Sequence, residues 1–313
     1  MSSLKIKGRN MLVLNTLSNN KIWGTSRMHN YAGDKSIDTV GSVYSASGIE
    51  ELSCEILYGD ESKDLYSAIK KNPKRFGLSE GVDYPIIVSF TGADEDLSIQ
   101  VHPTDEYAKE KENKLVGKSE SWYFIEEPDE GYIYAESLLE DKEKIKELIL
   151  EGKYEKVVDK KRVKKGDIVY IESGTLHALA KGALVYEIQQ STDITYRFYD
   201  FDRVDNEGNK RDLHLEDALN TLKTENRVNI SKFNINIEKD SKPYKLLRTK
   251  LSEKYTNNEK IAQTITVIKG DMIADGYNIK QGMSIMVLPG EEINISNQTG
   301  EVIIATPKLY FEV

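Results

Sequence analysis

The sequence has little cysteine and no long apolar run. Cys54 is the only cysteine among 313 residues, which excludes a disulfide within the chain. A lone cysteine fits a reducing compartment, and we expect this one to be a small buried hydrophobic residue. No run of about 18 apolar residues occurs, and residues 1–15 contain no apolar segment typical of a signal peptide. We therefore expect a cytoplasmic protein that does not insert into a membrane.

Net positive charge is also absent. Acidic residues outnumber basic residues by 52 to 43, which gives a net charge of -9. The resulting field repels nucleic acids and anionic lipids, so we expect neither as a partner. A phosphorylated ligand would have to be bound by a local group of Lys and Arg side chains.

Short apolar alternations separated by Gly, Asn and Asp fill most of the chain, a pattern typical of antiparallel β-structure closed into a sandwich or barrel. Amphipathic helices are predicted only at 61–77, 137–157 and 212–223. The strands predicted for a first barrel are 84–92, 96–103, 119–127, 131–136, 166–174, 182–190 and 193–201. The sequence thus predicts a mainly β fold with a few inserted helices.

Alternating strands resume at 262–307, after a polar stretch at 224–242. We therefore predict two domains, a catalytic one at 1–240 and a smaller β-domain at 241–313 that amino-terminal strands can complete. Histidine separates the two, because none of the four lies in the second. A histidine-ligated metal must then lie in the first barrel.

Imidazole and carboxylate side chains in three segments are candidates for one metal site. Gln100 and His102 alternate with apolar residues on a predicted strand, so both leave the same face, about 6.6 Å apart along it. Glu120 opens the strand 119–127, and His177 lies in a turn between two strands. Zinc binds such nitrogen and oxygen donors and keeps one position open in catalytic sites.

Spacing alone leaves other interpretations open. A polar row that faces water would make Gln100 and His102 surface residues. A histidine at a strand end is more often a hydrogen-bonded structural residue than a ligand, and an isolated Glu120 is more often a surface carboxylate. For His29 and His214 the structural or exposed interpretation is preferred.

Two charged residues stand in otherwise apolar strands. Glu187 interrupts GALVYEIQQ, and Arg197 lies between Tyr196 and Phe198. They could form an ion pair between strands or face solvent, but Arg197 is also suited to clamp an anion, because a guanidinium binds phosphate or an oxyanion through two hydrogen bonds. Lys118, two residues before Glu120, would add a second positive charge.

Four segments taken together, LSIQVHPTDEYA, GKSESWYFIE, ESGTLHAL and YEIQQSTDITYRFYDFDRVDNEGNKRDLHLEDAL, resemble the short bacterial form of the type I phosphomannose isomerase family. The resemblance covers most of residues 10–225, and KIWG at 21–24 is similar to the family's amino-terminal motif. It implies cupin-type jelly-roll barrels with one zinc ion in the first. The residues that it implies are the zinc ligands His102, Glu120 and His177 with Gln100 as a fourth, the active-site Arg197, and the pocket residues Lys118 and Glu187.

The activity implied by the resemblance is interconversion of mannose 6-phosphate and fructose 6-phosphate through a cis-enediol or enediolate. Such a reaction needs a Lewis acid, a base and an anion clamp. Two alternatives remain: an iron-dependent cupin oxygenase, because two histidines and a carboxylate also form a facial triad, and a non-catalytic sugar-binding cupin. We expect a phosphorylated hexose as the ligand of a monomer or weak homodimer.

Overall fold

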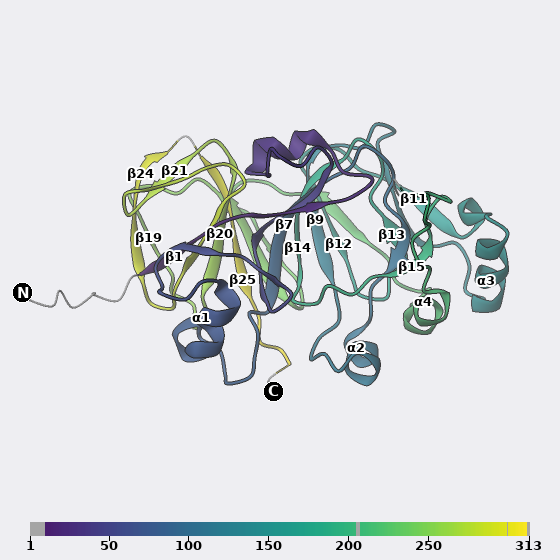
Figure 1. The fold of residues 1–313 in the computed structure, drawn as a ribbon, viewed down its shortest axis with the longest axis horizontal. Coiled ribbons are helices and arrows are strands. Elements are labelled where there is room, and N and C mark those ends of the chain that lie inside the picture. The colour runs from purple at the N-terminus through teal and green to yellow at the C-terminus, as the bar shows by residue number, and fades with distance from the viewer. Residues whose placement is uncertain (1–9, 205–206, 299, 312–313) are drawn as a thin grey trace, which may run out of the picture.

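The computed structural model describes residues 10–204, 207–298 and 300–311, and β-strands dominate this part of the chain. Two stacks of strands lie side by side along the long axis (Figure 1). In the stack at the right of that view, a seven-stranded sheet packs on a five-stranded one. The seven strands, in spatial order, are β16 (Asn229–Lys232), β12 (Asp167–Ile171), β9 (Glu120–Glu126), β14 (Leu184–Gln190), β7 (Ile86–Gly92), β3 (Val40–Ala46) and β2 (Leu17–Asn20). The five are β11 (Val158–Arg162), β10 (Tyr132–Ser137), β13 (His177–Ala178), β8 (Ile99–Val101) and β15 (Tyr196–Tyr199).

The other stack combines strands from both ends of the chain. Its larger sheet has the order β17 (Glu238–Asp240), β18 (Tyr244–Thr249), β25 (Glu301–Pro307), β20 (Gln263–Lys269), β23 (Ser284–Val287), β1 (Met11–Leu14) and β6 (Ile56–Tyr58). A smaller sheet consists of β19 (Lys254–Thr256), β24 (Glu292–Gln298), β21 (Met272–Ala274) and β22 (Tyr277–Ile279), and a short hairpin of β4 (Gly48–Ile49) and β5 (Leu52–Ser53) lies apart. The amino-terminal β1 pairs with β23, so the first strand of the chain lies among the last ones (Figure 1).

One apolar cluster runs between the two stacks. It joins Phe90 and Tyr186 of the first stack to Tyr244 and Met286 of the second. The buried Tyr84 hydroxyl also donates to the carbonyl oxygen of Ala262 at 2.8 Å. The two stacks share this continuous core. The division into two domains at 240/241 therefore stays a prediction.

The helices are short, and α1, α2 and α3 each begin at a capping side chain. They are α1 (Leu65–Lys71), α2 (Asp105–Lys111), α3 (Lys142–Leu150) and α4 (Leu215–Thr221), with 3₁₀ turns at Ser26–Tyr31, Pro73–Phe76 and Tyr154–Lys156. The Asp141 side chain accepts from the first turn of α3, and Gly152, with φ of 71°, follows its end. None of the described helices is long and apolar enough to cross a membrane.

The predicted helices are present but shorter than expected, and one helix was not predicted. The stretch 61–77 is divided because Pro73 starts a separate turn, and 137–157 is trimmed because β10 extends to Ser137. Helix α2 lies directly after β8, capped by the Thr104 side chain, which accepts from the Tyr107 N–H. The mainly β architecture itself is confirmed.

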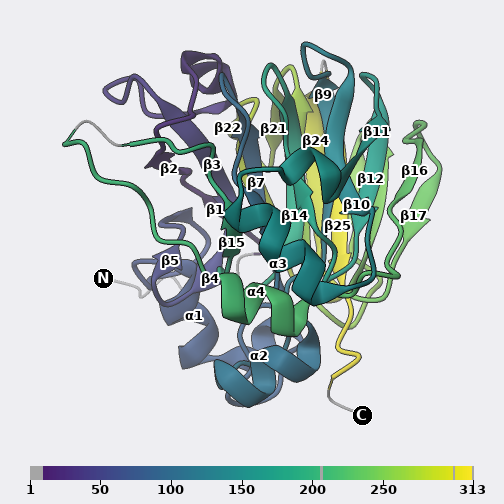
Figure 2. The same ribbon diagram turned by 90° about the vertical axis from the view of Figure 1, so that its right-hand side faces the viewer.

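Strand β8 determines which side chains face the barrel interior. Ile99 and Val101 pack outward in a cluster with apolar residues of α3 and α4, which cover this sheet (Figure 2). Gln100 therefore points to the opposite face, together with His102 just beyond the strand. Leu97 precedes the strand and belongs to the interior cluster that also contains Trp122, so it does not share the outward row that the alternation predicted.

Candidate metal centre and adjoining pocket

Three strands of two sheets bring His102, Glu120 and His177 together. His177 on β13 lies opposite Gln100 on β8, two residues from His102. Glu120 is the first residue of β9, in the facing sheet. All three side chains are at most 1% exposed. Segments that are far apart in the sequence thus place two imidazoles and one carboxylate in a single buried cluster.

The donor atoms of the cluster face one another. His102 Nε2 lies 3.2 Å from one carboxylate oxygen of Glu120, and His177 Nε2 lies 3.3 Å from the other. The ligand atoms of the three residues all lie within 4.8 Å of one another.

Backbone carbonyls fix the protonation of both imidazoles. His102 Nδ1 is 2.9 Å from the Ile194 carbonyl oxygen, and His177 Nδ1 is 2.8 Å from that of Thr175. A carbonyl only accepts, so each Nδ1 carries the proton and, in a neutral ring, each Nε2 carries a lone pair. Burial, and then the positive charge of Lys118, lower the pKa of His102 to about 4, which keeps that ring neutral.

This donor set fits a metal cation. His102 Nε2 and both Glu120 oxygens are buried and have no hydrogen-bond partner among the described residues. Lone pairs that face one another at such distances repel unless a cation lies between them. Tetrahedral zinc with ligands at about 2.05 Å has neighbouring ligands about 3.3 Å apart, close to the two separations found here.

Gln100 lies beside the cluster without completing it. Its amide nitrogen is 3.5 Å from His177 Nε2, while its oxygen accepts from the Ser98 hydroxyl at 3.1 Å. An amide binds a metal through oxygen, so the Gln100 amide must rotate by half a turn to act as a ligand.

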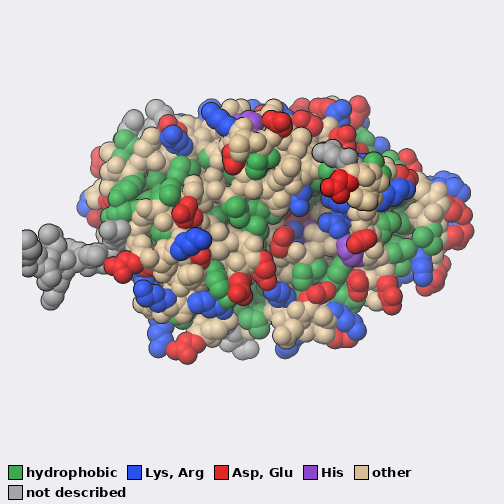
Figure 3. Space-filling model, in the orientation of Figure 1, with side chains coloured by type: hydrophobic (Ala, Val, Ile, Leu, Met, Phe, Trp, Pro, Cys, Tyr) green, Lys and Arg blue, Asp and Glu red, His purple; other side chains and the backbone are tan. Residues whose placement is uncertain are grey.

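A cavity of about 250 Å³ adjoins the cluster. Gln100 and Lys118 line it and separate it from the three buried donors, with Lys118 Nζ 3.6 Å from a Glu120 oxygen. The space-filling view shows a hollow right of centre with Lys and Arg side chains at its edge (Figure 3).

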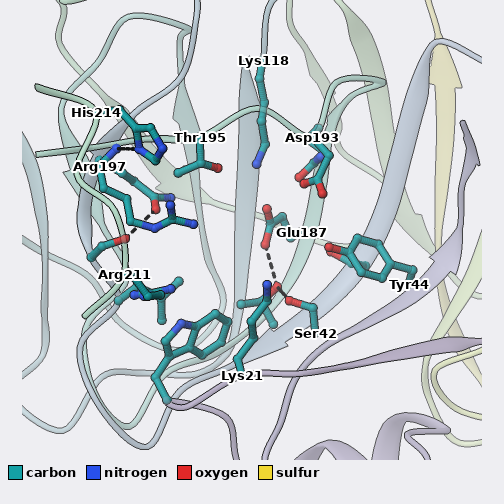
Figure 4. Close-up of a pocket in the computed structure, with 17 residues that line it drawn as sticks. Lys21, Ser42, Tyr44, Lys118, Glu187, Asp193, Thr195, Arg197, Arg211 and His214 are labelled. Atoms are coloured by element: carbon teal, nitrogen blue, oxygen red, sulfur yellow. Dashed lines mark hydrogen bonds between the residues drawn. The ribbon is translucent and has the colours of Figure 1, made fainter. Parts of the chain in front are cut away.

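Glu187 lies in the middle of the cavity (Figure 4). Its carboxylate accepts from the Thr91 hydroxyl at 2.6 Å, and no ion pair among the described residues joins it to Arg197. The two residues belong to different sheets, β14 and β15, and face each other across the cavity. Burial, and then the negative charge of Glu120, raise the pKa of Glu187 to about 7. The strand-to-strand ion pair considered from the sequence is therefore absent from the described part of the chain.

Four cationic side chains line the same cavity: Lys21, Lys118, Arg197 and Arg211. Figure 4 shows Lys21, Lys118 and Arg197 directed toward its middle. The Arg197 Nε is buried and has no hydrogen-bond partner in the described part of the chain, and burial followed by the charge of Arg211 lowers the pKa of Arg197. Burial lowers the pKa of Lys21 as well, opposed by Asp193 and reinforced by Arg197. This excess of positive charge is local, since the chain as a whole is acidic.

Three lining residues escaped the sequence prediction. Lys21 was noted only within the KIWG segment, Arg211 was not considered, and His214 was expected to be structural or exposed. Asp200 holds Arg211 in place, accepting from Arg211 Nε at 2.7 Å. Lys21 directly follows β2, whereas Arg211 and His214 lie in the segment between β15 and α4, where the sequence offers no comparable signal.

Comparison with known proteins decides the family. The mannose-6-phosphate isomerase of Streptococcus mutans is 36% identical over 216 residues, 67% of this chain and 67% of that protein. "Probable mannose-6-phosphate isomerase GmuF" of Bacillus subtilis is 37% identical over 213 residues, 67% of this chain and 68% of that protein. The chain belongs to the mannose-6-phosphate isomerase family. No protein-family model matches the sequence.

Solved structures of mannose-6-phosphate isomerases share the fold. The enzyme from Bacillus subtilis superimposes with a TM-score of 0.82 at 26% identity, covering 95% of this chain and 99% of that one. A phosphomannose isomerase variant from Salmonella typhimurium shares the fold at 14% identity, with a TM-score of 0.72 over 96% of this chain and all of that one. These are cupin folds, so the predicted cupin architecture is confirmed.

Proposed function

We propose that the protein is a zinc-dependent isomerase that interconverts mannose 6-phosphate and fructose 6-phosphate through a cis-enediol or enediolate. The observation that carries this proposal is a single cavity that adjoins the buried donors His102, Glu120 and His177 and is lined by four cationic side chains. Family membership supports the same substrate pair.

The cations match the substrate's phosphate group. A sugar phosphate brings nearly two negative charges, which an acidic protein attracts only through local positive charge. Arg197 and Arg211 offer planar guanidinium groups suited to phosphate or an oxyanion, and Lys21 adds a point charge from the bottom of the view in Figure 4.

His102, Glu120 and His177 would hold the zinc ion, with Gln100 as a fourth ligand once its amide oxygen turns inward. Bound there, zinc supplies a Lewis acid for the sugar's carbonyl oxygen. The Ile194 and Thr175 carbonyls keep both imidazoles in the tautomer that a metal requires.

Proton transfer falls to groups that line the cavity. Glu187 would accept the proton from C2 of the aldose; the electrons of that C–H bond form the C1–C2 double bond while the C1–O1 π pair moves onto O1. The hydroxyl proton of O2 passes to O1, and Glu187 would return its proton to C1 as the C2–O2 carbonyl forms. A carboxyl with a pKa of about 7 exchanges protons readily in both directions. Arg197 would stabilise the negative charge that develops on oxygen, and Lys118 is placed to do the same beside Glu120.

Elemental analysis of the purified protein combined with a coupled isomerase assay tests the proposal. We expect zinc and turnover of mannose 6-phosphate. Iron without isomerase turnover would favour the cupin oxygenase, and zinc with sugar-phosphate binding but no turnover would favour a binding protein. Either result overturns the proposed reaction.

A further inference from the structure

His214 is bonded to the outer edge of a sheet. Strand β15 is the last of its sheet, so the outward backbone groups of Arg197 need partners outside the ladder. Both bonds go to His214: its own N–H donates to the Arg197 carbonyl at 2.9 Å, and the Arg197 N–H donates to its Nδ1 at 3.2 Å. The ring is therefore held by the backbone of the residue that carries the candidate catalytic arginine.

The second of these bonds fixes the tautomer of the ring. A backbone N–H can only donate, so Nδ1 must present a lone pair. A neutral His214 then carries its proton on Nε2, the reverse of His102 and His177, whose Nδ1 atoms donate to carbonyls. Protonation of Nδ1 would break the bond to Arg197, so this contact also favours the neutral ring.

The surroundings of His214 also favour its neutral ring. Partial burial, and then the positive charge of Arg197, lower the pKa of His214, while Asp212 and Asp217 oppose the change more weakly. At neutral pH the ring is thus an uncharged hydrogen-bond donor.

The Nε2–H donor of His214 has no partner within residues 10–204, 207–298 and 300–311. None of the hydrogen bonds among the described residues uses His214 Nε2, although the side chain lines the cavity. Figure 4 shows one ring nitrogen on the Arg197 backbone and the other on the side of Thr195 and the open cavity. An N–H directed into a cavity of this size is placed to meet a ligand oxygen.

We propose that His214 contacts the substrate and donates one hydrogen bond, from Nε2–H, to an oxygen of the bound sugar phosphate. This rests on the proposed isomerase function and adds a specific donor to it. The same geometry excludes His214 as the base, because one nitrogen is occupied by a backbone N–H and the other carries the proton. A neutral donor stabilises an oxygen that gains negative charge without transferring its own proton to it.

The tautomer is measurable without any reaction. In zinc-loaded protein labelled with 15N-histidine, long-range 1H–15N correlation spectra at pH 7 should show a protonated Nε2 and an unprotonated Nδ1 for His214. The resonances are assigned by their loss in the His214→Gln variant. His102 and His177 serve as internal references with the reverse pattern. A protonated Nδ1, or a charged ring, would overturn the proposal whether or not the protein is an isomerase.

Kinetics test the contact with substrate. His214→Phe should lower kcat/KM for mannose 6-phosphate roughly 10- to 100-fold, the range for a lost hydrogen bond to a charged or charging oxygen, with zinc content unchanged. His214→Gln should recover part of the loss, because an amide can accept from the Arg197 N–H and donate into the cavity. Unchanged kcat/KM in folded His214→Phe would refute the contact. Absence of turnover in the wild type would instead refute the proposed function and leave the tautomer result standing.

Discussion

Zinc should raise the melting temperature of the metal-free protein by an amount that the structure allows us to state. His102 and His177 already lie 3.2 and 3.3 Å from the Glu120 oxygens, which is the spacing of neighbouring ligands around tetrahedral zinc, about 3.3 Å. Binding then requires little rearrangement of these three side chains, and it relieves the repulsion between their lone pairs. The free energy of binding should therefore add to the stability of the fold.

The size of the effect follows from linkage. Zinc at about 100 times its Kd stabilises a folded site by about 2.7 kcal/mol. An unfolding entropy of about 2.1 cal/mol/K per residue corresponds to about 0.7 kcal/mol/K for 313 residues. The expected rise in Tm is about 4 °C.

Calorimetry of chelator-treated protein with and without zinc measures this rise. The variant His177→Ala should lose it, whereas His29→Ala should keep it, because His29 bonds the Ile37 carbonyl away from the site. An equal rise in wild type and His177→Ala would mean that zinc binds elsewhere. No rise in the wild type would refute the metal site.

Three further predictions concern the cavity. Arg197→Ala should retain zinc but lower kcat/KM by about 100-fold or more, the loss typical of a donor to developing charge, and metal loss in this variant would refute the separation of roles. Arg211→Met should raise KM for mannose 6-phosphate roughly tenfold. Lys210→Met removes the same charge from an exposed residue and should leave KM unchanged. Equal effects of the two variants on KM would show that only net charge matters. Burial opposes ionisation of Asp200, but hydrogen bonds from Arg211 and Arg203 outweigh it and lower its pKa. Asp200→Asn should therefore lower the free energy of unfolding by about 2 kcal/mol above pH 5. The difference from the wild type should shrink as both proteins are acidified below about pH 4, because the wild-type carboxylate then becomes protonated. A pH-independent difference in urea unfolding would contradict this.

The alternation around Gln100 shows how much of the site the sequence alone could predict. It predicted a strand and a polar face, but it left open whether that face meets water or a site. Ile99 and Val101 are covered by α3 and α4, and this packing decides the question, because it turns Gln100 inward. The period of two could not show which face the helices would cover.

A local sequence signal could have revealed the missed helix α2, but not the missed cavity residues. Thr104 followed by two acidic residues is a recognisable helix start, so α2 could have been predicted. Lys21 and Arg211 carry no such signal, because strand pairing and the Asp200 contact bring them to the cavity from distant parts of the chain. The family resemblance implied His102, Glu120, His177 and Gln100 as zinc ligands; the structure brings the first three together, and their role as the zinc site stays a prediction.

The histidines show most clearly what the sequence alone cannot predict. The same side chain meets a backbone carbonyl at His102 and His177 and a backbone N–H at His214, and this difference alone reverses which ring nitrogen holds the proton. Two rings thereby turn a lone pair toward Glu120, and the third turns a proton toward the cavity. Every residue except proline has both backbone groups, so no sequence pattern records which of them a histidine will meet. The fold decides it for His102 and His214, whose partners Ile194 and Arg197 are 92 and 17 residues away in the sequence, and the chemistry available in the cavity therefore depends on these tertiary contacts as much as on the identity of the residues that line it.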